Sequence, residues 1–84
     1  MIEQRFKESI DRYISTGCPT GDFLRAVLEN DLTEAVGRAD ESAIWNLRDI
    51  VVYLYNEVPS ASWGSKEKVK AWRDRFIHKT TEHA

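Results

Sequence analysis

The sequence predicts an all-α protein, a compact bundle of four to five short helices forming one domain over residues 1–79. Apolar residues recur at steps of three and four along most of the chain, as on one face of an α-helix. Turn and cap residues interrupt this pattern at short intervals. The β-branched run 50–53 finds no second strand candidate to pair with, so we interpret it as helical.

The first two helices follow from apolar spacing and cap signals. The first carries one apolar stripe, made of Ile2, Phe6, Ile10, Tyr13 and Ile14. Gly17 supplies a left-handed stop, and Pro19 prevents continuation. Thr20 is the expected N-cap of a second short helix that ends near Asn30. Its buried face is predicted to hold Phe23, Leu24, Val27 and Leu28.

Three further helices follow. Asp31 and Glu34 have the spacing of a capping box and should open a very short helix that closes near Ala39. Asp40 is predicted to cap a fourth helix, which Pro59 ends, and Ser65 is predicted to cap the last helix. The fourth helix should turn a wide inner face to the core, formed by Ile44, Leu47, Ile50, Val51, Leu54 and Val58. Residues 80–84 are expected to fray.

The sequence carries no recognisable catalytic or metal site. Cys18 is the single cysteine, which excludes an internal disulfide and a cysteine-based zinc site. A reactive thiol next to a helix start is conceivable there, although a small buried residue is the simpler interpretation. His78 and His83 lie near the C-terminus and are interpreted as surface residues. We therefore expect a protein that is not an enzyme and uses no cofactor.

Charge is distributed unevenly along the chain. Residues 1–65 hold six Lys and Arg against eleven Asp and Glu, whereas residues 66–79 hold six against two. The last helix is therefore basic and the body acidic. It could pair with the body, dock an acidic partner or meet nucleic acid. The net charge of −2 makes double-stranded DNA an unfavourable partner.

The segment that opens the last helix has the composition of an anion site. A Gly64–Ser65 step at a helix start can turn backbone N–H groups outward, and Lys66 and Lys68 add positive charge. Trp63 could stack on a ring beside that site. A plain Ser N-cap, with Trp63 folded onto the core, is the alternative. With Lys70 and Arg73, these residues form the predicted ligand- or partner-binding surface.

Aromatic residues on the fourth helix suggest a second surface. Trp45 and Tyr53 are eight residues apart and are expected to lie roughly on one face, while Tyr55 lies on another. Either face could be an interface with a partner or with a second copy of the chain. Burial of both faces within the monomer is the alternative.

Three segments resemble a group of small bacteriophage- and prophage-encoded proteins that has no assigned activity. They are 21–40 (GDFLRAVLENDLTEAVGRAD), 55–60 (YNEVPS) and 63–65 (WGS), and the resemblance spans roughly residues 8–73. It implies expression inside an infected bacterium. Small accessory proteins of this kind commonly block or sequester a host component, and defence proteins and their nucleotide signals are typical targets.

Together these features favour a non-enzymatic phage accessory protein that masks a host macromolecule, with a host protein of a defence system among the expected targets. An oligomeric binder that sequesters a phosphorylated, nucleotide-type ligand is the alternative, and a nucleic-acid-binding regulator is a weaker one. The N-terminal segment lacks the apolar core of a signal peptide, and the longest apolar stretch, residues 50–55, is too short to cross a bilayer. We therefore expect a cytoplasmic protein that does not bind membranes.

Overall fold

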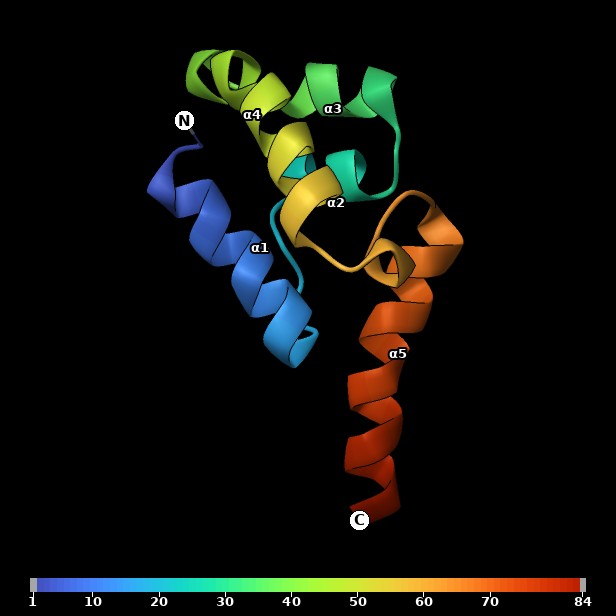
Figure 1. Cartoon of the computed structure of the whole chain (residues 1–84). Helices are drawn as coiled ribbons and strands as arrows, with labels where there is room; N and C mark the ends of the chain where they lie inside the picture. The colour runs from blue at the N-terminus through green and yellow to red at the C-terminus, as the bar shows by residue number, and fades with distance from the viewer. Residues whose placement is uncertain (1, 84) are drawn as a thin grey trace.

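The computed structural model describes the backbone of residues 2–83 and the side chains of residues 2–76, and it confirms the all-α fold. Figure 1 shows how its helices are arranged. The α-helices are α1 (Gln4–Thr16), α2 (Asp22–Leu28), α3 (Leu32–Arg38), α4 (Glu41–Glu57) and α5 (Lys66–His83), and a 3₁₀ turn, η1, spans Ser60–Ser62. The predicted helical run 50–53 lies inside α4. Residues 80–83, where we expected fraying, are helical as part of α5, and the side chains of His78 and His83 lie outside the described residues.

Helix α1 ends where Gly17 was predicted to stop it. Gly17 adopts a left-handed conformation, with φ of 72°, and its N–H donates to the Tyr13 carbonyl oxygen at 2.9 Å. The same glycine lies against Phe76 of α5, because a Cβ built on it would come within 2.5 Å of the Phe76 ring. Gly17 therefore ends one helix and lets a second one approach.

Side-chain caps explain where three of the later helices begin. The Asp31 carboxylate accepts the Glu34 N–H at 3.1 Å, and Ser65 Oγ accepts the Lys68 N–H at 3.1 Å. The Asp40 carboxylate accepts the Ala43 N–H at 2.7 Å. These three caps match the prediction.

The predicted cap of the second helix is wrong. The N-cap position of α2 is Gly21, which has no side chain to accept a hydrogen bond. Thr20 lies one residue too early, and its hydroxyl donates instead to the Gly21 carbonyl oxygen at 3.3 Å. Asp22 lies in the first turn of α2, where the helix dipole favours a carboxylate.

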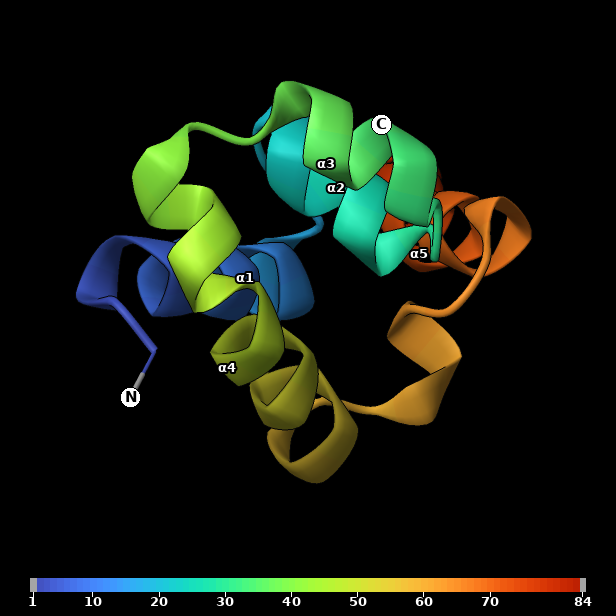
Figure 2. The same cartoon turned by 90° about the horizontal axis from the view of Figure 1, so that it is seen from above.

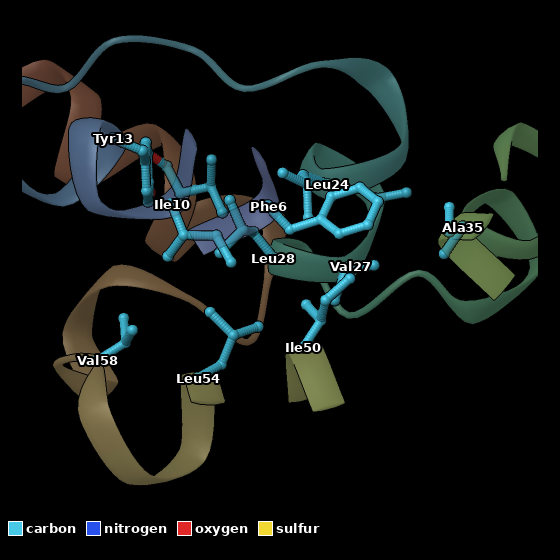
Figure 3. Close-up of a cluster of buried hydrophobic side chains, with 13 residues drawn as sticks. Phe6, Ile10, Tyr13, Leu24, Val27, Leu28, Ala35, Ile50, Leu54 and Val58 are labelled. Carbon is cyan, nitrogen blue, oxygen red and sulfur yellow. The ribbon is translucent and has the colours of Figure 1, made fainter. Parts of the chain in front are cut away.

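The core gathers side chains from α1, α2, α3, α4 and the start of α5 (Figure 3). Helix α4 contributes Ala43, Ile50 and Leu54, and Val58 follows at its C-terminal end. The predicted inner face of α4 was too wide, since Ile44 and Val51 are 40% and 41% exposed. A helix of this radius can bury only one stripe against the neighbours it meets, and these two residues lie at the edge of that stripe.

Hydrogen bonds made by Tyr13 and Trp72 connect α1 to the C-terminal part of the chain. The buried Tyr13 hydroxyl donates to the Ser62 carbonyl oxygen at 2.8 Å, and the Trp72 indole N–H donates to the Ile14 carbonyl oxygen at 3.3 Å. Helices α2 and α3 pack on each other, as Figure 2 shows from above. In Figure 1, α5 projects beyond the end of α1. These bonds hold the segment between α4 and α5 in place, and the candidate site is built on that segment.

Candidate functional site

The structure divides the predicted binding residues between two hollows on different sides of the start of α5. The first, here called the aromatic hollow, has a volume of about 760 Å³. It contains three residues of the predicted surface, Trp63, Gly64 and Lys68, together with Tyr55 of the predicted α4 interface. Its full lining is Asn30, Val51, Tyr55, Val58, Ser60, Trp63, Gly64 and Lys68.

The two aromatic residues of the hollow differ in burial. Tyr55 is 80% exposed and extends from α4 into solvent. Trp63 is half-buried and packs against the core, and its indole N–H is buried without a hydrogen-bond partner among the described residues. The packing of Trp63 onto the core agrees with the alternative interpretation of this residue, and the same ring forms part of the wall of the hollow.

Backbone geometry at the start of α5 shows how Gly64 and Lys68 come together. Gly64 has a φ of 113°, which side chains with a Cβ rarely allow, and a Cβ there would lie 3.7 Å from Lys68 Nζ. The Gly64 N–H donates to the Leu28 carbonyl oxygen at 2.6 Å, and the Lys68 N–H is used by the Ser65 cap. Two of the amides that an anion would need are thus already bonded within the chain.

The second, here called the mixed-charge groove, holds the rest of the predicted basic surface. It has a volume of about 730 Å³ and separates α5 from α2 and α3. Lys66, Lys70 and Arg73 line it together with Arg25, Glu29, Asp31, Glu34, Glu67 and Val69. Four cations and four carboxylates share the groove, so its charges balance. Such a surface attracts phosphate less than the sequence of the last helix suggested.

Electrostatics near the floor of this groove follow from burial. Burial raises the pKa of Tyr13 to about 12, because the phenolate would lose its hydration, while the Arg73 guanidinium opposes this rise and Glu29 adds to it. Arg73 Nε is itself buried without a hydrogen-bond partner among the described residues. Within α5, Lys70 pairs with Asp74 at 3.2 Å. Charges of the basic helix are therefore partly balanced inside the chain.

The candidate interface residues of α4 differ in burial. Trp45 is 78% exposed, whereas Tyr53 is half-buried and its hydroxyl bonds to the Asp11 carboxylate of α1. Burial and that carboxylate raise the pKa of Tyr53. The expectation that Trp45 and Tyr53 share a face is wrong, since an eight-residue step rotates the second side chain by roughly 80° around the helix. Tyr55 belongs to the aromatic hollow.

Several lining residues were not singled out in the sequence. Asn30, Val51, Val58 and Ser60 complete the aromatic hollow. Asn30 has a positive φ of 61°, a conformation in which Asn is enriched among residues other than Gly. The position of an Asn directly before the capping Asp31 was the sequence signal for this turn. The two valines resemble core residues in the sequence, so the sequence contained no signal that they line a hollow.

Of the residues considered for catalysis, Cys18 has its side chain among the described residues. Cys18 is half-buried, and its N–H donates to Thr16 Oγ1 at 3.2 Å. Among the described residues, no group of three or more His, Cys, Asp and Glu side chains is placed to hold a metal ion. In the same part of the chain, no helix has the length and apolar character to span a membrane.

Comparisons with protein families, with curated proteins and with solved structures found no match for this chain.

Proposed function

We propose that this chain is a non-enzymatic binding protein that masks a host macromolecule, with the aromatic hollow as its contact surface. One observation carries the proposal: the hollow joins an exposed aromatic residue, Tyr55, to Trp63, Gly64 and Lys68, which lie eight to thirteen residues further along the chain. Tyr and Trp are the residue types that most often anchor protein interfaces.

The chemistry of the hollow favours a protein segment as the partner. Val51 and Val58 supply apolar wall, and Tyr55 can close over a bound side chain because it is free in solvent. Of the eight described residues that line the hollow, Lys68 is the charged one. A partner segment with an apolar side chain next to a carboxylate would match this lining. The apolar side chain would be buried against the valines, and the carboxylate would pair with Lys68 at the rim.

The proposed setting is the cytoplasm of a bacterium infected by a phage, or one carrying a prophage. The resemblance of segments 21–40, 55–60 and 63–65 to phage-encoded proteins supports it. Masking of a host defence component is the role we propose there. A protein that acts by covering a surface of its partner needs an exposed binding site and no catalytic group. The aromatic hollow is the binding site that we propose.

A phosphorylated ligand of the nucleotide type is the second candidate for the same hollow. The observation that favours it is the presence of two aromatic rings, Tyr55 and Trp63, in one hollow with the Lys68 ammonium group. A volume of about 760 Å³ lies within the range of small-molecule sites. The bonded N–H groups of Gly64 and Lys68 count against this candidate, because they leave fewer donors for a phosphate.

Affinity capture from a bacterial lysate, with variants of the hollow, tests the proposal. We expect one host protein to be retained by the wild-type chain and lost with Tyr55→Ala and with Lys68→Glu. Trp45→Ala is the matched control, since Trp45 is as exposed as Tyr55 but does not line the hollow. Retention by all variants alike would remove the hollow from consideration.

Thermal shift measurements with a panel of linear and cyclic nucleotides separate the two candidates. Masking of a protein predicts no change in the melting temperature with any nucleotide. A ligand at a hundred times its dissociation constant would stabilise the fold by about 2.7 kcal/mol. A rise of several degrees that disappears in Lys68→Glu would therefore replace the first candidate with the second.

A further inference from the structure

The side of α4 that points away from the core forms a distinct face, here called the outward face. It consists of Glu41, Trp45, Arg48, Asp49, Val52 and Asn56. Glu41 precedes Trp45 by four residues, and the other four residues follow Trp45 by three, four, seven and eleven. These spacings place all of them on one side of an α-helix. Trp45 and the Arg48 side chain are 78% and 87% exposed. Val52 is 43% exposed, and Ile2 lines a hollow beside it, so the described residues cover this face only in part.

The order of residues on the outward face is self-complementary. Consider a second α4 that packs antiparallel across the outward face, with a twofold axis between residues 48 and 49. Each residue then faces the residue of the partner helix for which the two residue numbers add up to 97. Trp45 then meets Val52 of the partner subunit, and Arg48 meets Asp49 of the partner subunit. Glu41 meets Asn56 of the partner subunit, so a carboxylate faces an amide donor. Every pair occurs twice, as twofold symmetry requires.

We propose that a second copy of this chain covers the outward face, through antiparallel pairing of the two α4 helices. The axis falls next to residue 49, the midpoint of Glu41–Glu57, so the two helices overlap along their whole length of about 25 Å. Pairing of this kind brings helix axes to within roughly 8–10 Å, a distance at which side chains in these positions meet.

Charge complementarity identifies the occupant as a second copy. Arg48 Nη1 lies 3.7 Å from Asp49 Oδ1 of its own chain, which is too long for a hydrogen bond, and the Arg48 side chain is 87% exposed, so its guanidinium keeps N–H donors for a further carboxylate. The proposed register brings that carboxylate from the partner subunit's Asp49. Two guanidinium groups and two carboxylates then alternate around the axis. A partner without this plus–minus order would leave like charges opposed in a desolvated contact.

The area of the contact sets its strength. Two copies of Trp45 cover on the order of 300 Å² when buried, and the flanking residues extend this toward the small interfaces, below about 1,200 Å², that are typical of transient association. The dimer is therefore weak and depends on concentration. Val51 is rotated by roughly 120° from Trp45 around α4, so the wall of the aromatic hollow stays outside this contact. Tyr55, which follows Arg48 by seven residues, lies at the edge of the contact.

Sedimentation equilibrium of the whole chain from roughly 10 μM to about 1 mM tests the proposal. We expect the mass to rise from the 9.7 kDa of one chain to twice that value. A single-chain mass over the whole range overturns the proposal. So does a mass that exceeds two chains and keeps growing, because only a contact that does not close on itself extends in this way.

Two aromatic variants locate the contact. Trp45→Ala should weaken the dimer at least tenfold, and Tyr55→Ala, which removes an equally exposed ring at the edge of the contact, should have a much smaller effect. Equal effects of the two variants would overturn the proposal. Both side chains are largely exposed, so circular dichroism should show native folding in each case.

Charge reversal tests the register. Arg48→Asp should weaken the dimer at least tenfold, since it places two carboxylates opposite each other on both sides of the axis. Adding Asp49→Arg exchanges the two charges and should restore association, because residue 48 still faces the opposite charge at residue 49. An Arg48→Asp variant that dimerises like the wild-type chain overturns the register, and so does a folded exchange variant that stays monomeric. Should the exchange variant not fold, the two aromatic variants decide.

Discussion

Replacing Gly17 with Ala should destabilise the protein strongly, whereas replacing Gly37 with Ala should stabilise it. Gly17 has a φ of 72° at the end of α1, and a Cβ there would lie 2.5 Å from Phe76 Cδ2 and 2.9 Å from Cγ. Gly37 is inside α3, its φ is not in the positive range, and nothing lies within 4 Å of its Cβ position. The two substitutions add the same methyl group to opposite environments.

The magnitudes follow from these geometries. A left-handed conformation costs a residue with a Cβ about 1–2 kcal/mol. Moving the Phe76 ring away from the new methyl group also disturbs its edge contact with Trp72, so we expect a total of about 2–3 kcal/mol for Gly17→Ala. Gly37→Ala should contribute about 0.5–1 kcal/mol of stability, because Ala loses less backbone entropy in a helix.

Thermal unfolding followed by circular dichroism measures both changes. For a domain of this size, 1 kcal/mol corresponds to a shift of about 4–8 °C in the melting temperature. Gly17→Ala should therefore melt about 10–20 °C lower than the wild-type chain, and Gly37→Ala about 2–8 °C higher. The reasoning about the close approach of α1 and α5 is refuted if Gly17→Ala melts within about 2 °C of the wild-type chain.

Two further predictions concern the buried hydroxyl and the helix caps. Tyr13→Phe leaves the buried Ser62 carbonyl oxygen without its 2.8 Å donor, so urea unfolding should show a loss of about 1–2 kcal/mol. Because the pKa of Tyr13 is raised from 10.0 to about 12 in the folded protein, its contribution is complete below pH 10 and declines between pH 10 and 12. The wild-type chain should lose stability in that window, and a Tyr13→Phe variant with the same alkaline decline would contradict this assignment. Asp40→Ala removes the 2.7 Å cap hydrogen bond of α4 and should lower the free energy of unfolding by about 1 kcal/mol. Thr20 is not the N-cap of α2, so Thr20→Ala should change the melting temperature little. Equal effects of the two substitutions would contradict the assigned caps.

Both proposed contacts lie on α4, and this explains why its composition is so apolar. One side holds Ile50 and Leu54 in the core, a second brings Tyr55 to the aromatic hollow, and the third carries Trp45. A helix that is apolar around most of its circumference is either central to its domain or covered by other molecules. Here α4 is buried on one side only, and the two proposals assign an occupant to each of the others.

The short helices and most of their boundaries were predictable from the sequence. Gly17 ends α1, and Asp31, Asp40 and Ser65 cap α3, α4 and α5, because a cap is a contact between residues two to four positions apart. The prediction that Thr20 caps α2 was wrong by one position, because Gly21, the next residue, is the N-cap of α2.

Only the tertiary structure decided which residues share a site. In the sequence, Lys66, Lys68 and Lys70 belong to one basic segment, but Lys68 faces the aromatic hollow and the other two face the carboxylates of the mixed-charge groove. This division depends on the path of the chain into α5, which is held by bonds from Gly64 to Leu28 and from Tyr13 to Ser62. Those partners are 36 and 49 residues apart, a separation at which local spacing contains no information. The sequence determined the helices by short-range hydrogen bonding and apolar periodicity, and the crossing of those helices determined the surfaces.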